Sequence, residues 1–197
     1  MGGCGFSVDQ FWKEPRELLV DRVEDARDAQ QETVEEFQTT MEKFKSVTNF
    51  DGGDLEKQFN TLNSAFERSE KAAINISNRV DKVEQASEAL LKEWREELQQ
   101  YHDESLRQRS QRQYDETSVQ SEKLIVAMRR AEVKTKPVLD VFRDQVLFMK
   151  HNLNMQAITS LDSQTAEIET NVAGLIQEME ISIAEANQFI EAMDFTE

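Results

Sequence analysis

The residues most often used for catalysis and metal binding are few and widely separated in this chain. It has one cysteine, Cys4, and two histidines, His102 and His151. A di-metal helical bundle needs Glu-x-x-His pairs on facing helices, but the residues three places before the histidines are Gln99 and Phe148. We therefore expect no catalytic residue, no metal and no cofactor, and a protein that is not an enzyme and takes no small-molecule substrate.

A short basic segment is the first candidate contact site. Residues 105–113 contain Arg107, Arg109 and Arg112 and no acidic residue. A cluster of this kind is typical of a contact with anionic lipid head groups or with an acidic partner. The alternative is a solvated surface on which the arginines pair with the glutamates that precede them. The sequence leaves both interpretations open.

The amino-terminal segment supplies the second candidate site. Gly3-Cys4 matches the last two residues of a bacterial lipobox, whose cysteine becomes an acylated N-terminus. A signal peptide needs a charged and an apolar region before its cleavage site, whereas three residues precede Cys4. Myristoylation would want Ser or Thr at position 6, which is Phe6. The remaining interpretations are a trimmed lipoprotein and an incidental cysteine. We expect the first, with Cys4 as the lipid attachment site in a tail of residues 1–14.

The charge balance excludes one class of partner. The 197 residues include 39 Asp and Glu against 23 Lys and Arg, a net charge of −16. General nucleic-acid binding needs Lys and Arg to neutralise phosphates, so no nucleic acid is expected. Nine of the acidic residues lie in residues 152–197, where there is no Lys or Arg. Such a segment usually forms a solvated face or pairs with cations of a neighbouring helix, the first or the third, and a basic partner protein is a further alternative. No apolar run approaches the roughly 20 residues of a membrane span.

Helix breakers and apolar spacing indicate the elements that position these residues. Between Gly53 and Pro137 lie 83 residues without Gly or Pro, far too many for a loop in a compact domain. Apolar residues there recur at alternating steps of three and four, as in coiled coils. Similar stripes predict four helices, near residues 16–50, 54–101, 104–152 and 155–194.

Short connections between these helices force antiparallel neighbours. The predicted fold is all-α: an elongated up-down-up-down four-helix antiparallel bundle with coiled-coil-like packing, in a single domain of residues 15–197. Because the second and third helices are the longest, the hairpin around residues 95–112 should project as a two-helix tip. The start of the chain would lie beside that tip, and we expect Phe11 or Trp12 to pack near Trp94.

The third predicted helix has two unusual features. Its apolar stripe keeps its spacing through Pro137, which favours one kinked helix over two separate ones. Its first half is polar at the core-like positions Ser110, Gln113, Thr117 and Ser121. Such a stretch is typical of a loosely packed or water-lined end of a bundle.

Four longer strings resemble a known family. They are Leu19–Gln30, Asn49–Leu55, Ala127–Glu132 and Val146–Asn154. These strings are similar to a proteobacterial family catalogued as domain of unknown function 2959, over nearly the whole chain from about residue 15. Members often look like lipoproteins, which implies an acylation position at Cys4. The resemblance implies no activity and no catalytic residue.

The pattern as a whole favours a non-enzymatic role. Our leading hypothesis is an envelope-associated helical spacer or protein-interaction module on the periplasmic side, tethered through lipidated Cys4. The alternative is a soluble, self-assembling coiled-coil scaffold or chaperone-like binder. An exposed apolar stripe on the third helix, together with concentration-dependent assembly, would favour the alternative. The partner is therefore an unidentified protein or a second copy of the chain.

Overall fold

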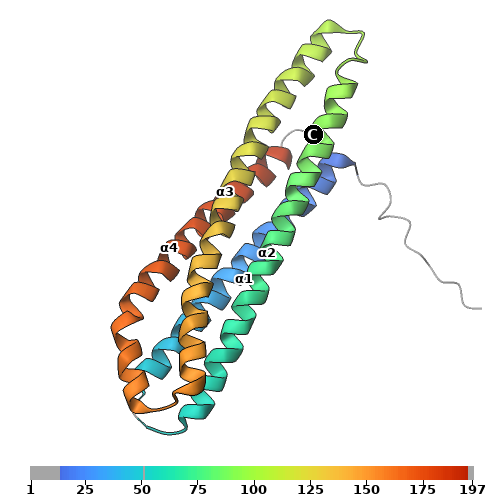
Figure 1. The fold of residues 1–197 in the computed structure, drawn as a ribbon. Coiled ribbons are helices and arrows are strands. Elements are labelled where there is room, and N and C mark those ends of the chain that lie inside the picture. The colour runs from blue at the N-terminus through green and yellow to red at the C-terminus, as the bar shows by residue number, and fades with distance from the viewer. Residues whose placement is uncertain (1–13, 51, 195–197) are drawn as a thin grey trace, which may run out of the picture.

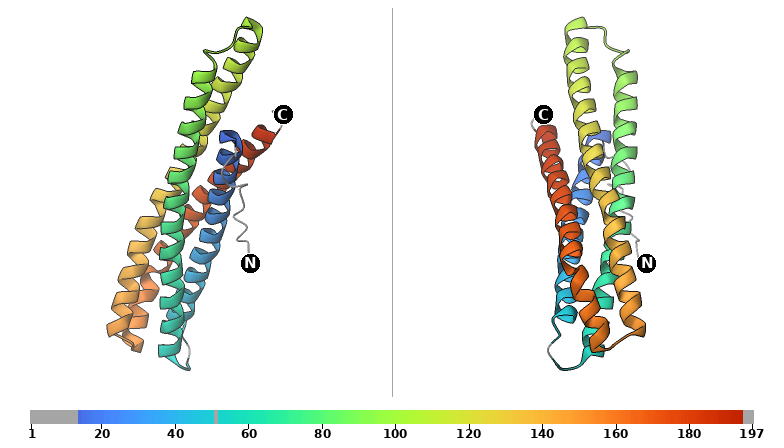
Figure 2. Two further views of the ribbon diagram at one scale, coloured as in Figure 1. Left: turned by 90° about the vertical axis from the view of Figure 1, so that its right-hand side faces the viewer. Right: turned by 60° about the vertical axis from the view of Figure 1, so that its left-hand side comes forward.

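The described part of the chain folds into four long helices, whose arrangement is drawn in Figure 1. The computed structural model describes residues 14–50 and 52–194, apart from some side chains near residue 160 and that of residue 194. The helices are α1 (Pro15–Thr48), α2 (Leu55–Glu97), α3 (Glu104–His151) and α4 (Met155–Asp194). Each helix packs against two neighbours, with α1 and α3 both lying between α2 and α4. The predicted four-helix antiparallel bundle is confirmed, and Figure 2 shows its elongated shape from two further sides.

Local sequence signals explain where the helices begin and end. Pro15 occupies the first turn of α1, where its missing N–H costs nothing. The Asp54 side chain accepts a hydrogen bond from the Lys57 N–H at 3.0 Å and so caps α2, as predicted. The turn before it uses Gly52 and Gly53 at φ of 140° and 105°, conformations that a side chain would strain.

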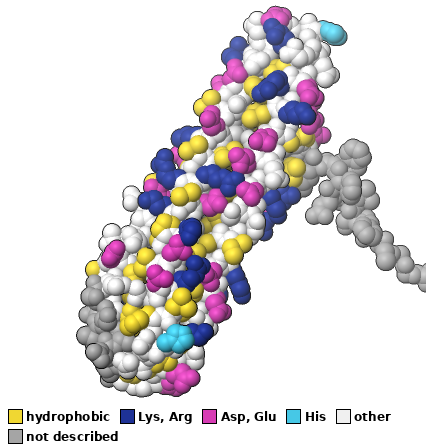
Figure 3. All heavy atoms as spheres, in the orientation of Figure 1, with side chains coloured by type: hydrophobic (Ala, Val, Ile, Leu, Met, Phe, Trp, Pro, Cys, Tyr) yellow, Lys and Arg dark blue, Asp and Glu magenta, His cyan; other side chains and the backbone are white. Residues whose placement is uncertain are grey.

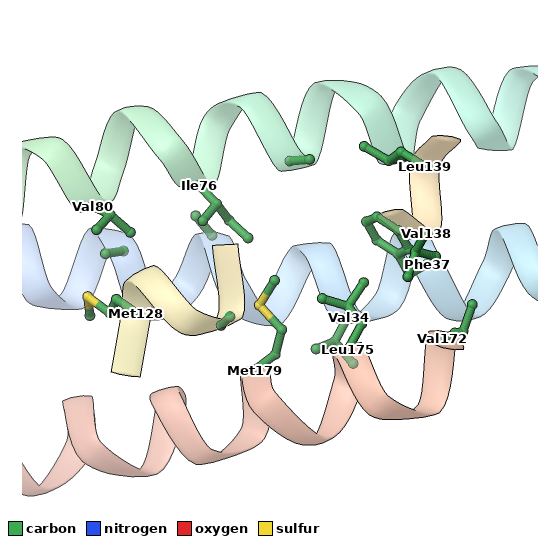
Figure 4. Close-up of a cluster of buried hydrophobic side chains, with 14 of the residues drawn as sticks. Val34, Phe37, Ile76, Val80, Met128, Val138, Leu139, Val172, Leu175 and Met179 are labelled. Carbon is green, nitrogen blue, oxygen red and sulfur yellow. The ribbon is translucent and has the colours of Figure 1, made fainter. Parts of the chain in front are cut away.

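The predicted apolar stripes form one core that runs through all four helices. Phe37 of α1, Ile76 of α2, Phe142 of α3 and Met179 of α4 are all fully buried. Figure 4 shows such side chains converging from the four helices. The rings of Phe44 and Phe142 meet edge to face, with centroids 6.0 Å apart. Burial of this kind supplies most of the stability of long amphipathic helices.

Several positions of the stripes differ in the structure. The three-and-four spacing predicts burial of Leu106, Gln113, Leu153 and Ile183, among others, whereas Leu153 is 39% exposed. In α4 the buried residue is Ser182, whereas Ile183 is only half-buried. The reason is the fully buried Gln30 of α1, whose Oε1 accepts a hydrogen bond from the Ser182 hydroxyl at 3.0 Å. In α3 the buried residue is Tyr114 and Gln113 is half-buried. Leu106, also assigned to the stripe, is 49% exposed.

Helix α3 passes through Pro137 without interruption, which agrees with the single-helix interpretation. A proline inside a helix removes one main-chain hydrogen bond, and the carbonyl that loses its donor lies four residues earlier. That carbonyl belongs to Val133, a residue that is 70% exposed. Water can therefore replace the missing donor, so the register of the stripe continues on both sides of the proline.

Ion pairs join the helices on the outside of the bundle. Cationic and acidic side chains alternate along its length (Figure 3). Lys45 of α1 pairs with Glu169 of α4. Lys123 of α3 also reaches α4, where its Nζ lies 2.8 Å from a carboxylate oxygen of Glu185. Of the alternatives for the acidic last helix, these contacts support pairing with cations of neighbouring helices, and both the first and the third helix supply them.

Candidate functional site

The hairpin between α2 and α3 projects beyond the start of α1 and the end of α4 (Figures 1 and 2). We call its outer part, residues 95–112, the tip. Helix α2 ends at Glu97 and α3 begins at Glu104. Asp103 caps α3, because its carboxylate accepts hydrogen bonds from the N–H groups of Ser105 and Leu106 at 2.8 and 3.0 Å. The predicted projection is confirmed, and it rests on a well-capped turn.

Four side chains brace the base of the tip. The Trp94 indole N–H donates to the Ser110 hydroxyl at 2.8 Å, and its ring meets that of Tyr114 edge to face at 6.0 Å. Arg95 donates to the Tyr114 hydroxyl at 2.7 Å and its guanidinium lies 5.8 Å from the centre of the same ring. These contacts hold α2 to α3 at the level where α1 begins and α4 ends.

The three predicted contact arginines differ in their contacts. Arg107 forms a double hydrogen bond with Glu104, at 2.8 and 2.9 Å. This bond, with a second one from Gln108, lowers the pKa of the Glu104 carboxyl from 4.5 to about 2. Arg109 and Arg112 are exposed, and within the described part of the chain no ion pair to them is found. Arg109 and Arg112 therefore give the tip an exposed cationic surface, whereas Arg107 is paired with Glu104.

The tip as a whole is not a basic surface. Helix α2 brings several carboxylates to the same region, and the two ends of the basic segment carry others. Acidic residues between positions 93 and 116 are Glu93, Glu96, Glu97, Asp103, Glu104, Asp115 and Glu116. A contact with an anionic surface would therefore have to use Arg109 and Arg112 locally. The linear sequence hid this because the α2 carboxylates come near only through the hairpin.

A small pocket of about 200 Å³ lies below the tip, where the four-helix body begins. Its walls include Arg16 of α1, Trp94 of α2, Gln113 and Thr117 of α3, and Met193 of α4. Arg16 also donates to the main-chain oxygen of Met193, which ties the start of α1 to the end of α4. The predicted loosely packed, polar bundle end lies here, although the contact predicted for Phe11 or Trp12 falls outside the described residues.

A second cluster of charges connects α2 to α3 within the body. The guanidinium of Arg129 donates to Asp81 and Glu84 of α2, each at 2.6 Å, and to Glu132 at 2.8 Å. Although partial burial lowers the pKa of Arg129, the hydrogen bonds to these three carboxylates raise it overall. The arginine is therefore held fully charged, and the cluster is a structural clamp between two helices.

Three further features considered in the sequence are the lipid attachment site, a metal site and a membrane span. Cys4 lies outside the described residues. Within 14–50 and 52–194, no group of three or more His, Cys, Asp or Glu side chains could hold a metal ion. None of the described helices is long and apolar enough to cross a membrane.

These features define the class of the molecule as an elongated, antiparallel four-helix bundle with a braced, projecting hairpin. The chain belongs to the family described as protein of unknown function DUF2959, whose family model matches residues 7–193. The resemblance found in the sequence strings is thereby confirmed. A comparison with curated proteins finds no match for the chain.

Proposed function

We propose that this protein is a non-enzymatic spacer or protein-interaction module of the bacterial cell envelope. The observation that carries the proposal is the braced tip of α2 and α3. A hairpin that projects from a rigid body, and is fixed at its base by Trp94, Arg95 and Tyr114, presents a contact surface at a set distance. Helix α2, with 43 residues, spans about 65 Å at 1.5 Å per residue.

Lipidation of Cys4 would attach the molecule at the same end as the tip. The first residue of the four-helix body, near Arg16, shares a pocket with Trp94 at the base of the tip. From Cys4 to Glu14 the chain can span at most about 35 Å. The tip extends about eight residues beyond Trp94, or about 12 Å of helix. The tether is therefore long enough for the tip and the lipid to meet one membrane surface.

Arg109 and Arg112 are the residues proposed to contact that surface. Both are exposed, and each cation near an anionic leaflet contributes about 1 kcal/mol. Two such contacts are weak alone, and a single acyl chain also gives only marginal binding. A lipid anchor combined with the two arginines would hold the molecule at the membrane and orient its long axis.

Metabolic labelling with a fatty-acid analogue tests the tether. The full-length gene product is expressed in a bacterial host beside a Cys4→Ser variant, and both are examined for incorporated label. We expect label on the wild-type protein and none on the variant. Equal label on both proteins, or label on neither, would refute the tether.

Vesicle pelleting tests the arginines without the lipid anchor. Arg109→Gln/Arg112→Gln is compared with Lys71→Gln/Lys82→Gln, which removes the same charge from exposed positions of α2. We expect vesicles rich in anionic phosphatidylglycerol to pellet more wild-type protein than neutral vesicles do. The arginine variant should lose this difference and the lysine variant should keep it. An equal loss in both variants would show that the contact is not specific to the tip.

A further inference from the structure

The outward face of α3 carries a row of exposed valines. Val119, Val126 and Val133 follow one another at seven-residue intervals and are 66%, 52% and 70% exposed. Each lies two residues after a core position of the α3 stripe. The corresponding positions of α2 are all polar: Ser64, Lys71, Asn78, Gln85 and Lys92. Because β-branched residues are not favoured on the exposed face of a helix, the valine row is unexplained by the bundle itself.

Charged residues extend the row at both ends with the same spacing. Seven residues before Val119 is Arg112, and seven after Val133 is Asp140. The row therefore consists of a cation, three valines and an anion. Its positions are spaced symmetrically about Val126, and the residues at its two ends carry opposite charges. When two copies run antiparallel with Val126 on the axis, Arg112 of each copy faces Asp140 of the other. Val119 of each faces Val133 of the other.

The positions beside the row show the same complementarity. They are acidic towards the start of α3, at Glu116 and Glu122, and basic further on, at Arg130 and Lys136. The antiparallel arrangement sets Glu116 opposite Lys136 and Glu122 opposite Arg130. It also sets Lys123 opposite Arg129, but both of these cations pair with carboxylates of their own chain. Lys136 and Asp140, which pair with each other within one chain at 2.5 Å, would share their charges with Glu116 and Arg112 of the other copy. A parallel arrangement would instead align each residue with its own copy and bring like charges together.

None of the described residues covers this face of the bundle. Arg129 and Arg143 extend to one side, where they pair with carboxylates of α2. Lys123 and Arg130 extend to the other side, towards carboxylates of α4. The valines lie between these two lines of ion pairs. Next to Val133, a groove of about 500 Å³ between α2 and α3 adds further apolar surface.

We propose that two copies of the chain pair through this face of α3, antiparallel, about a two-fold axis at Val126. Such an interface uses the same patch on both copies and closes on itself. From Arg112 to Asp140 it extends about 42 Å along the helix. An interface made by one helix of each copy is small, so the dimer should dissociate in the micromolar range. The two tips would point to opposite ends of the dimer. The pairing does not require the lipid tether. Arg112 can contact either Asp140 of the other copy or a membrane surface but not both at once, so the dimer and the membrane contact of Arg112 are alternative states.

Cysteine cross-linking tests both the partner and the register. Single cysteines are placed at Val126, Val119 and Val133 in a Cys4→Ser background, with Asn78→Cys of α2 as the matched control. Under mild oxidation we expect Val126→Cys to form a disulfide-linked dimer. Val119→Cys and Val133→Cys should each stay monomeric alone and should form a mixed dimer when combined. Self-linking of Val119→Cys as fast as Val126→Cys, or no linking above the control, would overturn the proposal.

Sedimentation equilibrium gives an independent measurement on the whole chain. We expect a concentration-dependent dimer that Val126→Glu abolishes and Asn78→Glu leaves intact, with equal helical circular dichroism in all three proteins. Arg112→Asp and Asp140→Arg should each weaken the dimer about tenfold, because each alters two contacts in the dimer. The combined exchange should restore it. A wild-type monomer at all concentrations up to several hundred micromolar would refute the pairing, whatever the labelling of Cys4 shows.

Discussion

At the scale of single residues, Gln30 is the most unusual member of the core. Its amide oxygen accepts a hydrogen bond from the hydroxyl of Ser182, but its Nε2 atom is buried and has no hydrogen-bond partner among the described residues. Burying an unpaired amide group costs free energy, whereas a buried polar pair can help to specify one register among several similar ones. The pair of Gln30 and Ser182 therefore lowers the free energy of unfolding somewhat, but it helps to define the alignment of α1 with α4.

This account predicts that single and double substitutions at the pair have opposite effects on the free energy of unfolding. Ser182→Ala alone leaves both polar atoms of the Gln30 amide without partners and should lower the free energy of unfolding by about 1–2 kcal/mol. Gln30→Leu/Ser182→Ala removes the polar pair and should raise it by about 1 kcal/mol, or about 3 °C in Tm. Urea and thermal unfolding followed by circular dichroism measure both. A double variant less stable than the wild-type protein would contradict this account.

Glu104 gives a second prediction at this scale. The pKa of its carboxyl, about 2 in the folded protein, lies below its ordinary value of 4.5 because Arg107 and Gln108 donate to it. The charged pair therefore favours the folded tip above about pH 4.5, and this contribution is lost as the pH falls from there towards 2. A carboxyl titration by NMR should find the Glu104 midpoint near 2 and, in Arg107→Gln, closer to 4.5. The same midpoint in both proteins would show that Arg107 is not the cause.

At the scale of elements, the α2–α3 hairpin depends on the brace at its base. The Tyr114 hydroxyl accepts both hydrogen bonds from Arg95, at 2.7 and 3.2 Å. Tyr114→Phe should loosen the tip while leaving the body unchanged, because the main hydrophobic core ends below it. Hydrogen exchange should become faster in residues 95–112 only. Tyr101→Phe, at an exposed position of the turn, is the control and should change nothing. Uniformly faster exchange after Tyr114→Phe would mean that the tip and body unfold together.

The elements also show how far the sequence could predict the fold. The stripes of α1 and α2 predicted buried positions well, because a long run of regular spacing averages out local exceptions. The errors fell where the environment changes along one helix. Leu106 fits the stripe but is exposed, since only α2 covers α3 at that height. Ser182 was missed because its burial depends on Gln30, a residue 152 positions away.

The candidate site was less predictable than the fold for the same physical reason. The sequence identified Arg107, Arg109 and Arg112, but not which of them pairs with a carboxylate. Tyr114 was missed because Gln113 satisfied the spacing equally well, and only the ring of Trp94 on the facing helix distinguishes the two. A spacing rule locates a side chain on one helix, whereas a site depends on what the next helix brings opposite it.

At the scale of the whole molecule, charge both attracts and repels. Ion pairs such as Lys123–Glu185 join the helices at 2.8 Å, and each exposed pair contributes about 0–1 kcal/mol. The net charge of −16 acts in the opposite direction, because unpaired carboxylates repel one another along the whole bundle. The two effects differ in range. Salt at about 0.15 M screens charges beyond about 8 Å but weakens a contact under 4 Å much less.

The difference in range predicts the sign of the salt effect. Raising NaCl from about 0.01 to 0.3 M should remove most of the long-range repulsion and leave most of each short ion pair, so the Tm at pH 7 should rise and then level off. Thermal unfolding followed by circular dichroism measures this directly. The control is the same series near the sequence pI of about 4.6, where the net charge vanishes and salt should have little effect or a slightly unfavourable one. A Tm that falls steadily with salt at pH 7 would mean that the ion pairs between helices outweigh the repulsion, and that α4 depends on them for its place in the bundle.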